Sequence, residues 1–192
     1  MCINISGELS GTYRSAVLGA AECVDHVSVI DSRNATMGQG LLVLEALATR
    51  DQATDLESFV EHLETVREKI FTFGTLNTLE NLRRGGRIGA AQAFFGSLLS
   101  IKPIVEVRHG HVEGESKQRT RSRSLNYLAD KVKDAGPLAR LAVIHALADD
   151  LMDFVQLLDG VEVDEEIIIS SMGPVIGAHT GVGTIGVAFQ KH

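Results

Sequence analysis

The sequence predicts an α/β fold in two parts, with a boundary near residue 70. Before that point, apolar strand-like segments alternate with helix-like ones, which is the pattern of a parallel sheet. After it, apolar strands are joined by short turns, with helices between them, which predicts an α+β part with antiparallel strands. The chain has 192 residues, 44% of them hydrophobic, enough for one domain or two small ones. We therefore expect domains at residues 1–70 and 71–192.

The first part is expected to contain two strands and three helices. A short apolar run predicts a strand over residues 1–5, and Ser10 is expected to cap the helix that follows. A second strand ends at Asp31. The segment 37–48 is apolar on nearly all sides, which predicts a buried helix, and Thr54 begins a capping box that opens the third helix. The apolar face of the first helix is predicted at Ala16, Val17, Ala20, Ala21 and Val24.

The second part is expected to alternate strands with helices. The predicted strands lie at 71–74, 103–107, 138–145, 166–170 and 185–189. The predicted helices lie at 76–82, 90–99, 122–133 and 147–158, with a glycine-rich loop at 177–186. Gly85-Gly86 is expected to end the first of these helices in a turn that needs a positive φ. The run Arg108-His109-Gly110-His111 is expected to form a hairpin turn.

Composition and charge exclude several classes of protein. The formal net charge is −7, which disfavours general binding to nucleic acid. Residues 81–133 nevertheless hold eleven Lys or Arg against four Asp or Glu, which indicates a local anion or an acidic partner. Cys2 and Cys23 have no metal-like spacing. No apolar run approaches the ~20 residues of a membrane span, and no signal peptide is visible, so we expect a soluble cytoplasmic protein.

A first candidate site is the turn at Ser6-Gly7 through Ser10. A strand that leads through this turn into a helix offers free backbone N–H groups and the positive end of a dipole, which suit a carboxylate or a phosphate. An ordinary helix cap explains the same residues. Arg87 is a second candidate, because it lies beyond the Gly85-Gly86 turn and could hold an anion through two bonds.

Further basic and imidazole side chains extend the candidate site. Four basic residues alternate along the chain, Lys117, Arg119, Arg121 and Arg123, which would place them on one side of an extended segment to meet an acidic protein or a phosphate. A solvated face is the other interpretation. His179 lies in the glycine-rich loop, from which it could reach a ligand, or be satisfied by backbone in a turn. No catalytic set, metal site or cofactor motif is found, so we expect neither enzymatic chemistry nor a cofactor.

Five segments in order resemble the DegV family of fatty-acid-binding proteins. The first has Gly7 where the family has a serine, and the last has Val182 where the family has a proline. The segments are Ile5–Ala16, Val27–Leu44, Gly85–Ile104, Lys117–Arg121 and Gly173–Gly183.

The resemblance implies a Rossmann-like domain facing a smaller domain, with a long-chain fatty acid in an apolar tunnel. It implies that in bacteria a separate fatty-acid kinase phosphorylates the acid, while the binding protein does no chemistry itself. The carboxylate would lie near the first turn and the histidine loop, and the kinase or its phosphate would meet the basic residues. The fatty-acid site would contain Ser6, Gly7, Ser10 and His179. The anion or partner contacts would be Arg87, Lys117, Arg119 and Arg121. Segments 37–48 and 90–99 would supply the tunnel wall.

One departure from the family leaves alternatives open. The family's Asp-Ser…Asp-Leu strand motif and its Thr-Ser-x-Pro loop do not occur in this sequence, so we expect the Rossmann-like domain to be truncated. The chain could then be a remnant that binds nothing, or an interaction module, or could rely on oligomer contacts. An enzyme acting on a phosphorylated small molecule is a further alternative, since the first turn and Arg87 would also suit a phosphate.

Overall fold

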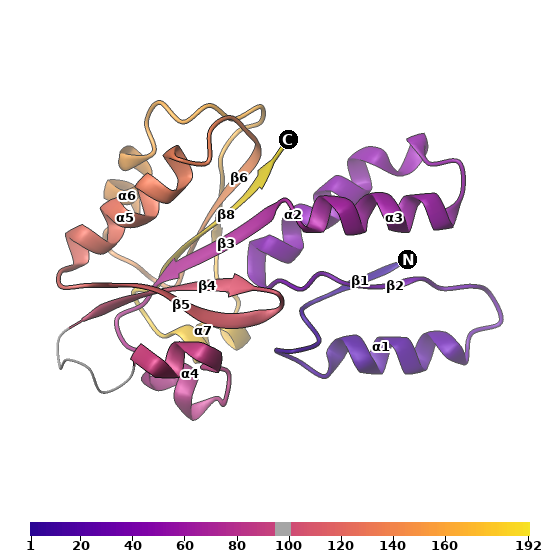
Figure 1. Cartoon of the computed structure of the whole chain (residues 1–192), viewed down its shortest axis with the longest axis horizontal. Helices are drawn as coiled ribbons and strands as arrows, with labels where there is room; N and C mark the ends of the chain where they lie inside the picture. Colours follow the sequence, from indigo (N-terminus) through magenta and orange to yellow (C-terminus); the bar gives the residue numbers. More distant parts are fainter. Residues whose placement is uncertain (95–100) are drawn as a thin grey trace.

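The computed structural model describes residues 1–94 and 101–192. Two short parallel strands and three helices lie at one end of the molecule, and a twisted six-stranded sheet occupies the other (Figure 1). The strands of the small sheet are β1 (Cys2–Asn4) and β2 (Val29–Asp31). The six-stranded sheet comprises β3 (Ile70–Thr75), β4 (Lys102–Arg108), β5 (His111–Gln118), β6 (Leu138–His145), β7 (Ile168–Ser171) and β8 (Ile185–Lys191).

The six-stranded sheet is mixed, with the strand order β5-β4-β3-β8-β6-β7. Only β6 and β7 pair in parallel; the other neighbours are antiparallel. The predicted fold class, a small parallel sheet followed by a part rich in antiparallel strands, is therefore confirmed. The predicted hairpin also forms, because Arg108 pairs with His111 across the turn between β4 and β5.

Helices cover both faces of this sheet, whereas the first helix of the chain packs beside the small sheet. Their bounds are α1 (Thr12–Ala21), α2 (Thr36–Thr49), α3 (Leu56–Arg67), α4 (Glu80–Arg84), α5 (Arg121–Lys133), α6 (Leu151–Leu157) and α7 (Pro174–Thr180), with 3-10 turns η1 (Arg50–Gln52) and η2 (Gly89–Phe94). Helix α3 is capped by the Asp55 side chain, which accepts from the Ser58 N–H at 2.8 Å, so the predicted cap at Thr54 is wrong by one residue.

Three other helix predictions need correction. Burial of 37–48 on all sides is wrong, because α2 packs one face only, and Leu47 on the other is 57% exposed. The loop predicted at 177–186 is helical up to Thr180, because Pro174 starts α7, which ends where Gly181 takes φ 86°. The helix predicted at 90–99 is the 3-10 turn η2 as far as Phe94, and the rest lies outside the described residues.

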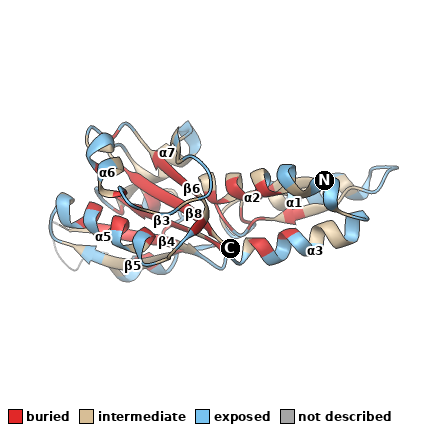
Figure 2. Ribbon diagram, turned by 90° about the horizontal axis from the view of Figure 1, so that it is seen from above, coloured by how far each residue is buried: buried red, intermediate tan, exposed pale blue. Residues whose placement is uncertain are grey.

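The core forms three clusters, and the strands at its centre are the most buried elements (Figure 2). One cluster packs α5 and α6 on one sheet face, around Phe154 and Val187. A second packs α2 and α3 on the other face, and it joins Leu41 to Ala142 and Ala188. The two parts of the chain therefore share a core across residue 70. A third lies beside the β4–β5 hairpin, around Leu76 and Leu82.

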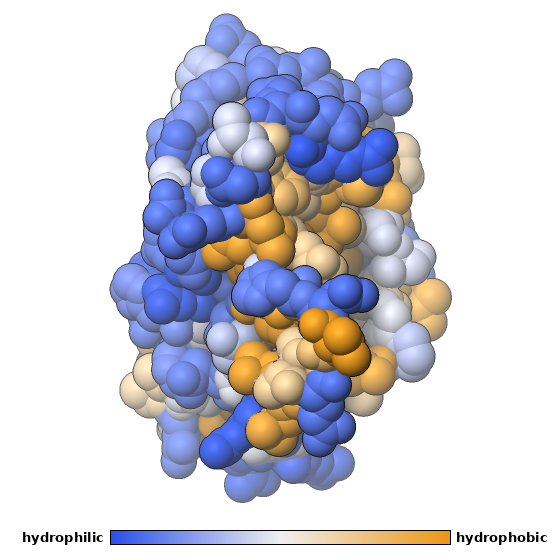
Figure 3. Space-filling model, turned by 90° about the vertical axis from the view of Figure 1, so that its right-hand side faces the viewer, coloured by the Kyte–Doolittle hydropathy of each residue, from blue (hydrophilic) through white to orange (hydrophobic). Residues whose placement is uncertain are grey.

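The end of the molecule that carries β1, β2 and α1 exposes apolar side chains (Figure 3). Helix α1 has no buried residue, and Leu18 on it is 65% exposed. The apolar face predicted for this helix is thus only partly covered: Ala16 and Ala20 are half-buried, Val17 and Ala21 are exposed, and Val24 lies beyond the end of the helix.

Candidate functional site

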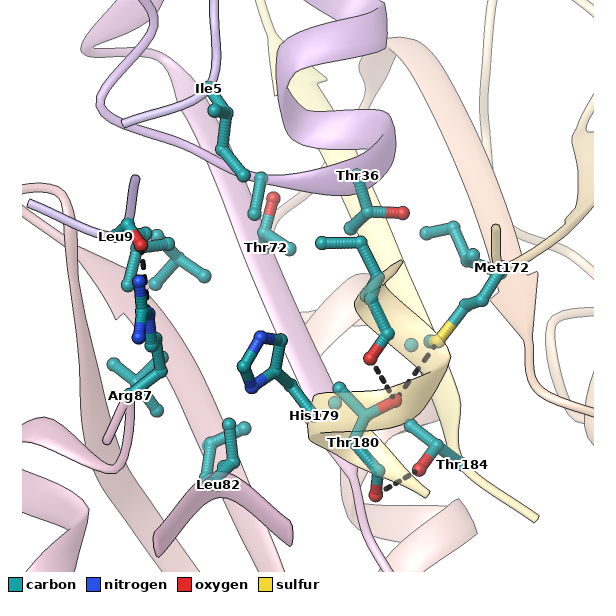
Figure 4. Close-up of a pocket in the computed structure, with 18 of the residues that line it drawn as sticks. Ile5, Leu9, Thr36, Thr72, Leu82, Arg87, Met172, His179, Thr180 and Thr184 are labelled. Atoms are coloured by element: carbon teal, nitrogen blue, oxygen red, sulfur yellow. Dashed lines mark hydrogen bonds between the residues drawn. The ribbon is translucent and has the colours of Figure 1, made fainter. Parts of the chain in front are cut away.

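A cavity of about 290 Å³ lies on the sheet face that α2 also covers. Residues from the first turn, the start of α2, β3, α4, the β4–β5 hairpin, β6 and the segment 172–186 line it. Figure 4 shows labelled side chains such as Ile5, Leu82 and His179 around a common space. The lining is mainly apolar, with a few hydroxyl groups, one imidazole and one guanidinium. Its apolar members include Ile5, Leu9, Phe73, Leu76, Leu82, Val105, Val107, Val112, Ile144, Met172, Val175 and Ile176.

The floor of the cavity is formed by β3 and β8. Gly74 of β3 pairs in register with Gly186 of β8, and both line the cavity. Two facing glycines leave no side chains above the backbone at this point, so space remains between the sheet and the elements that cover it. A glycine inside a strand often marks a close approach of a ligand or another backbone. The sequence analysis missed this signal.

Three predicted site residues, Ser10, Arg87 and His179, line the cavity together. Arg87 donates from Nε to the Leu9 carbonyl at 3.1 Å and from Nη1 to the Gly85 carbonyl at 2.8 Å, so its guanidinium bridges the first turn and the Gly85-Gly86 turn. These three residues form a polar rim, and we use the name polar rim for them below.

His179 reaches the rim because residue 85 is a glycine. A Cβ atom on Gly85 would lie 2.1 Å from His179 Nδ1, so any side chain at that position would displace the imidazole. No hydrogen bond or ion pair involves the His179 ring among the residues that the structure describes. A neutral or protonated imidazole is therefore available to donate to a ligand oxygen.

Ser6 and Gly7 lie next to the cavity but do not line it. The Ser6 hydroxyl is fully buried and donates to the Gly110 carbonyl at 2.8 Å, which ties the first turn to the β4–β5 hairpin. The Gly7 N–H donates to Asp31 Oδ2 at 3.2 Å. Both predicted ligand groups thus have partners within the protein, and they hold the turn that presents Ser10.

The three predicted basic contacts do not share one face. Lys117 lies near the end of β5, and its ammonium group is 4.5 Å from the centroid of the Phe94 ring. Arg119 follows the strand and is exposed. Arg121 starts α5, and its guanidinium binds both Asp150 carboxylate oxygens, at 2.7 and 2.8 Å. The predicted alternation along an extended segment is wrong, because the chain turns into a helix at Arg121. The hydrogen bonds from Arg121 hold the pKa of Asp150 below its usual value.

The tunnel walls expected from 37–48 and 90–99 differ from those observed. No residue of 37–48 lines the cavity, although Ala35 and Thr36, just before that range, do. No residue of 90–94 lines it either. Valines of the β4–β5 hairpin and residues of α7 take this place. In the described ranges 1–94 and 101–192, no cluster of three metal-ligating side chains occurs, and no helix has the length and apolar character that crossing a membrane requires.

Comparisons with known proteins give one consistent family. The model of the DegV family, described as an uncharacterised protein family, matches residues 1–192. A DegV domain-containing protein of Streptomyces coelicolor is 36% identical over 98% of this chain and 69% of its own length. One from Mycobacterium tuberculosis is 35% identical over 97% of this chain and 68% of its own length.

Solved structures agree with these relatives. A DegV family protein from Thermus thermophilus, described by its fatty acid binding, superposes with a TM-score of 0.88 and 34% identity over 98% of this chain and 69% of that one. A fatty acid binding DegV family protein from Streptococcus agalactiae has a TM-score of 0.86 and 29% identity, over 98% and 68%. A DegV family protein from Ruminococcus gnavus, refined with vaccenic acid, has a TM-score of 0.82 and 28% identity, over 97% and 70%.

Proposed function

This chain belongs to the DegV family, and on that premise we propose that its cavity binds the hydrocarbon chain of a long-chain fatty acid. The observation that carries the proposal is an apolar cavity of about 290 Å³ that ends in a polar rim. Its volume lies near the lower end of the ~300–1,000 Å³ usual for small-molecule sites. The related structures described with fatty acids support the choice of ligand.

The apolar lining supplies most of the affinity in this proposal. Each methylene that leaves water contributes roughly 0.8 kcal/mol, so a chain of several carbons outweighs any single polar contact. The polar rim then fixes the orientation. Arg87 and His179 can donate charge-assisted hydrogen bonds to the carboxylate, and Ser10 adds a hydroxyl. Ser6 and Gly7 act indirectly, by holding the turn.

A carboxylate at the rim would remain within reach of a second protein. Arg87 is exposed, as are Lys117 and Arg119. We therefore propose that the chain presents the carboxylate to a separate fatty-acid kinase, with Lys117 and Arg119 on the docking side. Arg121 supports the start of α5 through Asp150 and has no direct part in docking.

Extraction of bound lipid is the first test. The purified protein is denatured and extracted, and the extract is examined by mass spectrometry; about one acyl chain per protein is expected. The delipidated protein is then titrated with hexadecanoic acid by calorimetry. An extract without acyl chains, together with no heat of binding, contradicts the proposal.

The role of the polar rim is tested with a matched pair of ligands. Arg87→Gln is expected to weaken hexadecanoic acid about tenfold, because one charge-assisted bond to the carboxylate is lost. The same variant should bind hexadecanol as the wild type does, because the alcohol carries no charge. Equal weakening for both ligands would assign Arg87 a structural role instead.

A further inference from the structure

The side chains around the floor glycines form a row across four strands. Val105 of β4 pairs with Gly74 of β3, Gly74 pairs with Gly186 of β8, and Gly186 pairs with Ile144 of β6. All four residues line the cavity. Directly paired residues face the same side of a sheet. The row therefore carries a bulky side chain on β4, no side chain on β3 or β8, and a bulky side chain on β6. The sheet surface is therefore hollowed along the β3–β8 pair.

The cavity extends beyond this row. One step along β3, Thr72 and its β4 partner Val107 also line the cavity, whereas Ala188, the β8 partner of Thr72, belongs to the core under α2. In the other direction Thr184 precedes β8 and also lines the cavity. We call this hollow, floored by Gly74 and Gly186 and walled by Val105 and Ile144, the trough. Neighbouring strands lie about 4.8 Å apart, so the wall strands β4 and β6 are three spacings, or about 14 Å, apart, which leaves room for a hydrocarbon chain between their side chains.

The two floor glycines are present for different reasons. A Cβ atom on Gly186 would lie 3.1 Å from the Phe73 carbonyl oxygen, so backbone packing restricts that position. A Cβ atom on Gly74 would meet nothing closer than the Ile185 carbonyl oxygen at 3.6 Å, an ordinary contact. Nor does Gly74 have a positive φ, since it is absent from the residues with that conformation. Neither sterics nor backbone conformation requires glycine at residue 74.

Glycine inside a strand costs stability relative to residues with a side chain. Gly74 lies inside β3, one residue before its end at Thr75, and no local constraint there requires glycine. The one consequence of its missing side chain is the open floor of the cavity. We propose that Gly74 determines which acyl chains the protein accepts, because the hydrocarbon lies along the trough directly over it. This inference rests on the proposed function, and it assigns the path of the chain and the residue that controls it.

A graded series at residue 74 tests the inference. Gly74→Ala adds one carbon to the floor and Gly74→Val adds three. If each added carbon displaces roughly one methylene of the ligand, affinity falls about fourfold per carbon. Hexadecanoic acid should therefore bind about fourfold more weakly to the alanine variant and about sixty-fold more weakly to the valine variant. Shorter acids should lose less, so the preferred chain length should fall.

The neighbouring residue on the same strand provides the control. Thr75 points to the opposite sheet face, is fully buried and has no hydrogen-bond partner for its hydroxyl within the described chain. Thr75→Val keeps the shape of the side chain and should leave affinity unchanged. Melting temperatures of all variants show whether the fold is kept, and Gly74→Ala remains informative if Gly74→Val does not fold.

The outcomes separate the two proposals. Binding by the wild type with graded loss in the Gly74 series supports the trough. Binding by the wild type with unchanged affinity in folded Gly74 variants overturns the trough and leaves fatty-acid binding intact. Absence of binding by the wild type overturns both.

Discussion

A buried carboxylate on α2 offers a stability prediction that depends on the packing between the two parts of the chain. Glu45 Oε1 accepts from His62 Nε2 of α3 at 3.0 Å. Glu45 Oε2 accepts from Arg140 Nη1 of β6 at 2.5 Å and from Gln190 Nε2 of β8 at 3.1 Å. Four elements therefore meet at one carboxylate, and the side chains of Glu45 and Arg140 are each only 11% exposed.

The proposed change is Glu45→Gln, which keeps the size of the side chain and removes its charge. Breaking a buried ion pair costs roughly 3–5 kcal/mol, because the remaining charge loses its partner. Arg140 keeps a second carboxylate within reach, since its Nε lies 2.9 Å from Glu165 Oε1. The loss should therefore fall at the lower end, about 3 kcal/mol, which is a large part of the ~5–15 kcal/mol that stabilises a typical domain.

Glu80 provides a matched control on the surface. Its carboxylate binds Arg83 at 2.8 Å and Arg84 at 2.9 Å, a similar set of contacts, but these lie within one short exposed helix. Exposed pairs of this kind contribute little to stability, because water and salt screen them. Glu80→Gln should therefore change the free energy of unfolding far less than Glu45→Gln does.

Urea unfolding followed by circular dichroism measures both variants. If the urea unfolding curves of Glu45→Gln and Glu80→Gln have the same midpoint and the same slope, burial does not strengthen the contacts of Glu45. A pH series adds a second readout. Burial acts to raise the pKa of Glu45, but hydrogen bonds from Gln190, Arg140 and His62 outweigh it and hold the pKa below its usual value. Its stabilisation is thus complete above the pKa of the unfolded chain and is lost as pH falls through the folded pKa; Glu45→Gln should lack this loss.

Three further predictions concern residues near the site. Ser6→Ala removes the buried bond to the Gly110 carbonyl, so it should destabilise the fold by about 1–2 kcal/mol in a thermal melt; a change in fatty-acid affinity larger than about threefold would mean that Ser6 touches the ligand. Arg121→Met should raise the pKa of Asp150 toward its ordinary value, as followed by NMR, and leave affinity for hexadecanoic acid unchanged; weaker binding would show that Arg121 does act at the site. Lys117→Glu combined with Arg119→Glu should slow acyl-phosphate formation by a fatty-acid kinase at least tenfold without changing fatty-acid affinity, whereas Lys133→Glu should not; equal rates for the two would remove this surface from the docking proposal.

Local sequence patterns were sufficient where the structure is locally determined. The strand predicted at 138–145 coincides with β6, because its apolar run Leu141–Ile144 is buried on both faces, which leaves few alternatives. The Gly85-Gly86 turn also forms as predicted, with Gly86 at φ 69°. Patterns failed where two signals competed. Glycines between Gly177 and Gly186 suggested a loop, but Pro174 at the first turn favours α7.

The site was predictable in part, and the limits are physical. Ser10, Arg87 and His179 do line one cavity, although their contact with a ligand stays a prediction. The Ser6 hydroxyl was assigned to a ligand because sequence cannot show its partner, the carbonyl of Gly110, which lies far along the chain. Gly74 could have been found, since a glycine in an apolar strand is visible in the sequence, but only strand pairing reveals that Gly186 lies opposite.

The position of β8 sets the order in which this molecule can be completed. During synthesis β8, which pairs with β3 and β6, is made more than a hundred residues after β3. Until then β3 and β6 have no common neighbour, and the cavity has only half its floor. Long-range pairings of this kind slow folding and leave apolar edges open to aggregation. The cavity floor, with Gly74 on one strand and Gly186 on the other, is therefore complete only when β8 has paired with β3.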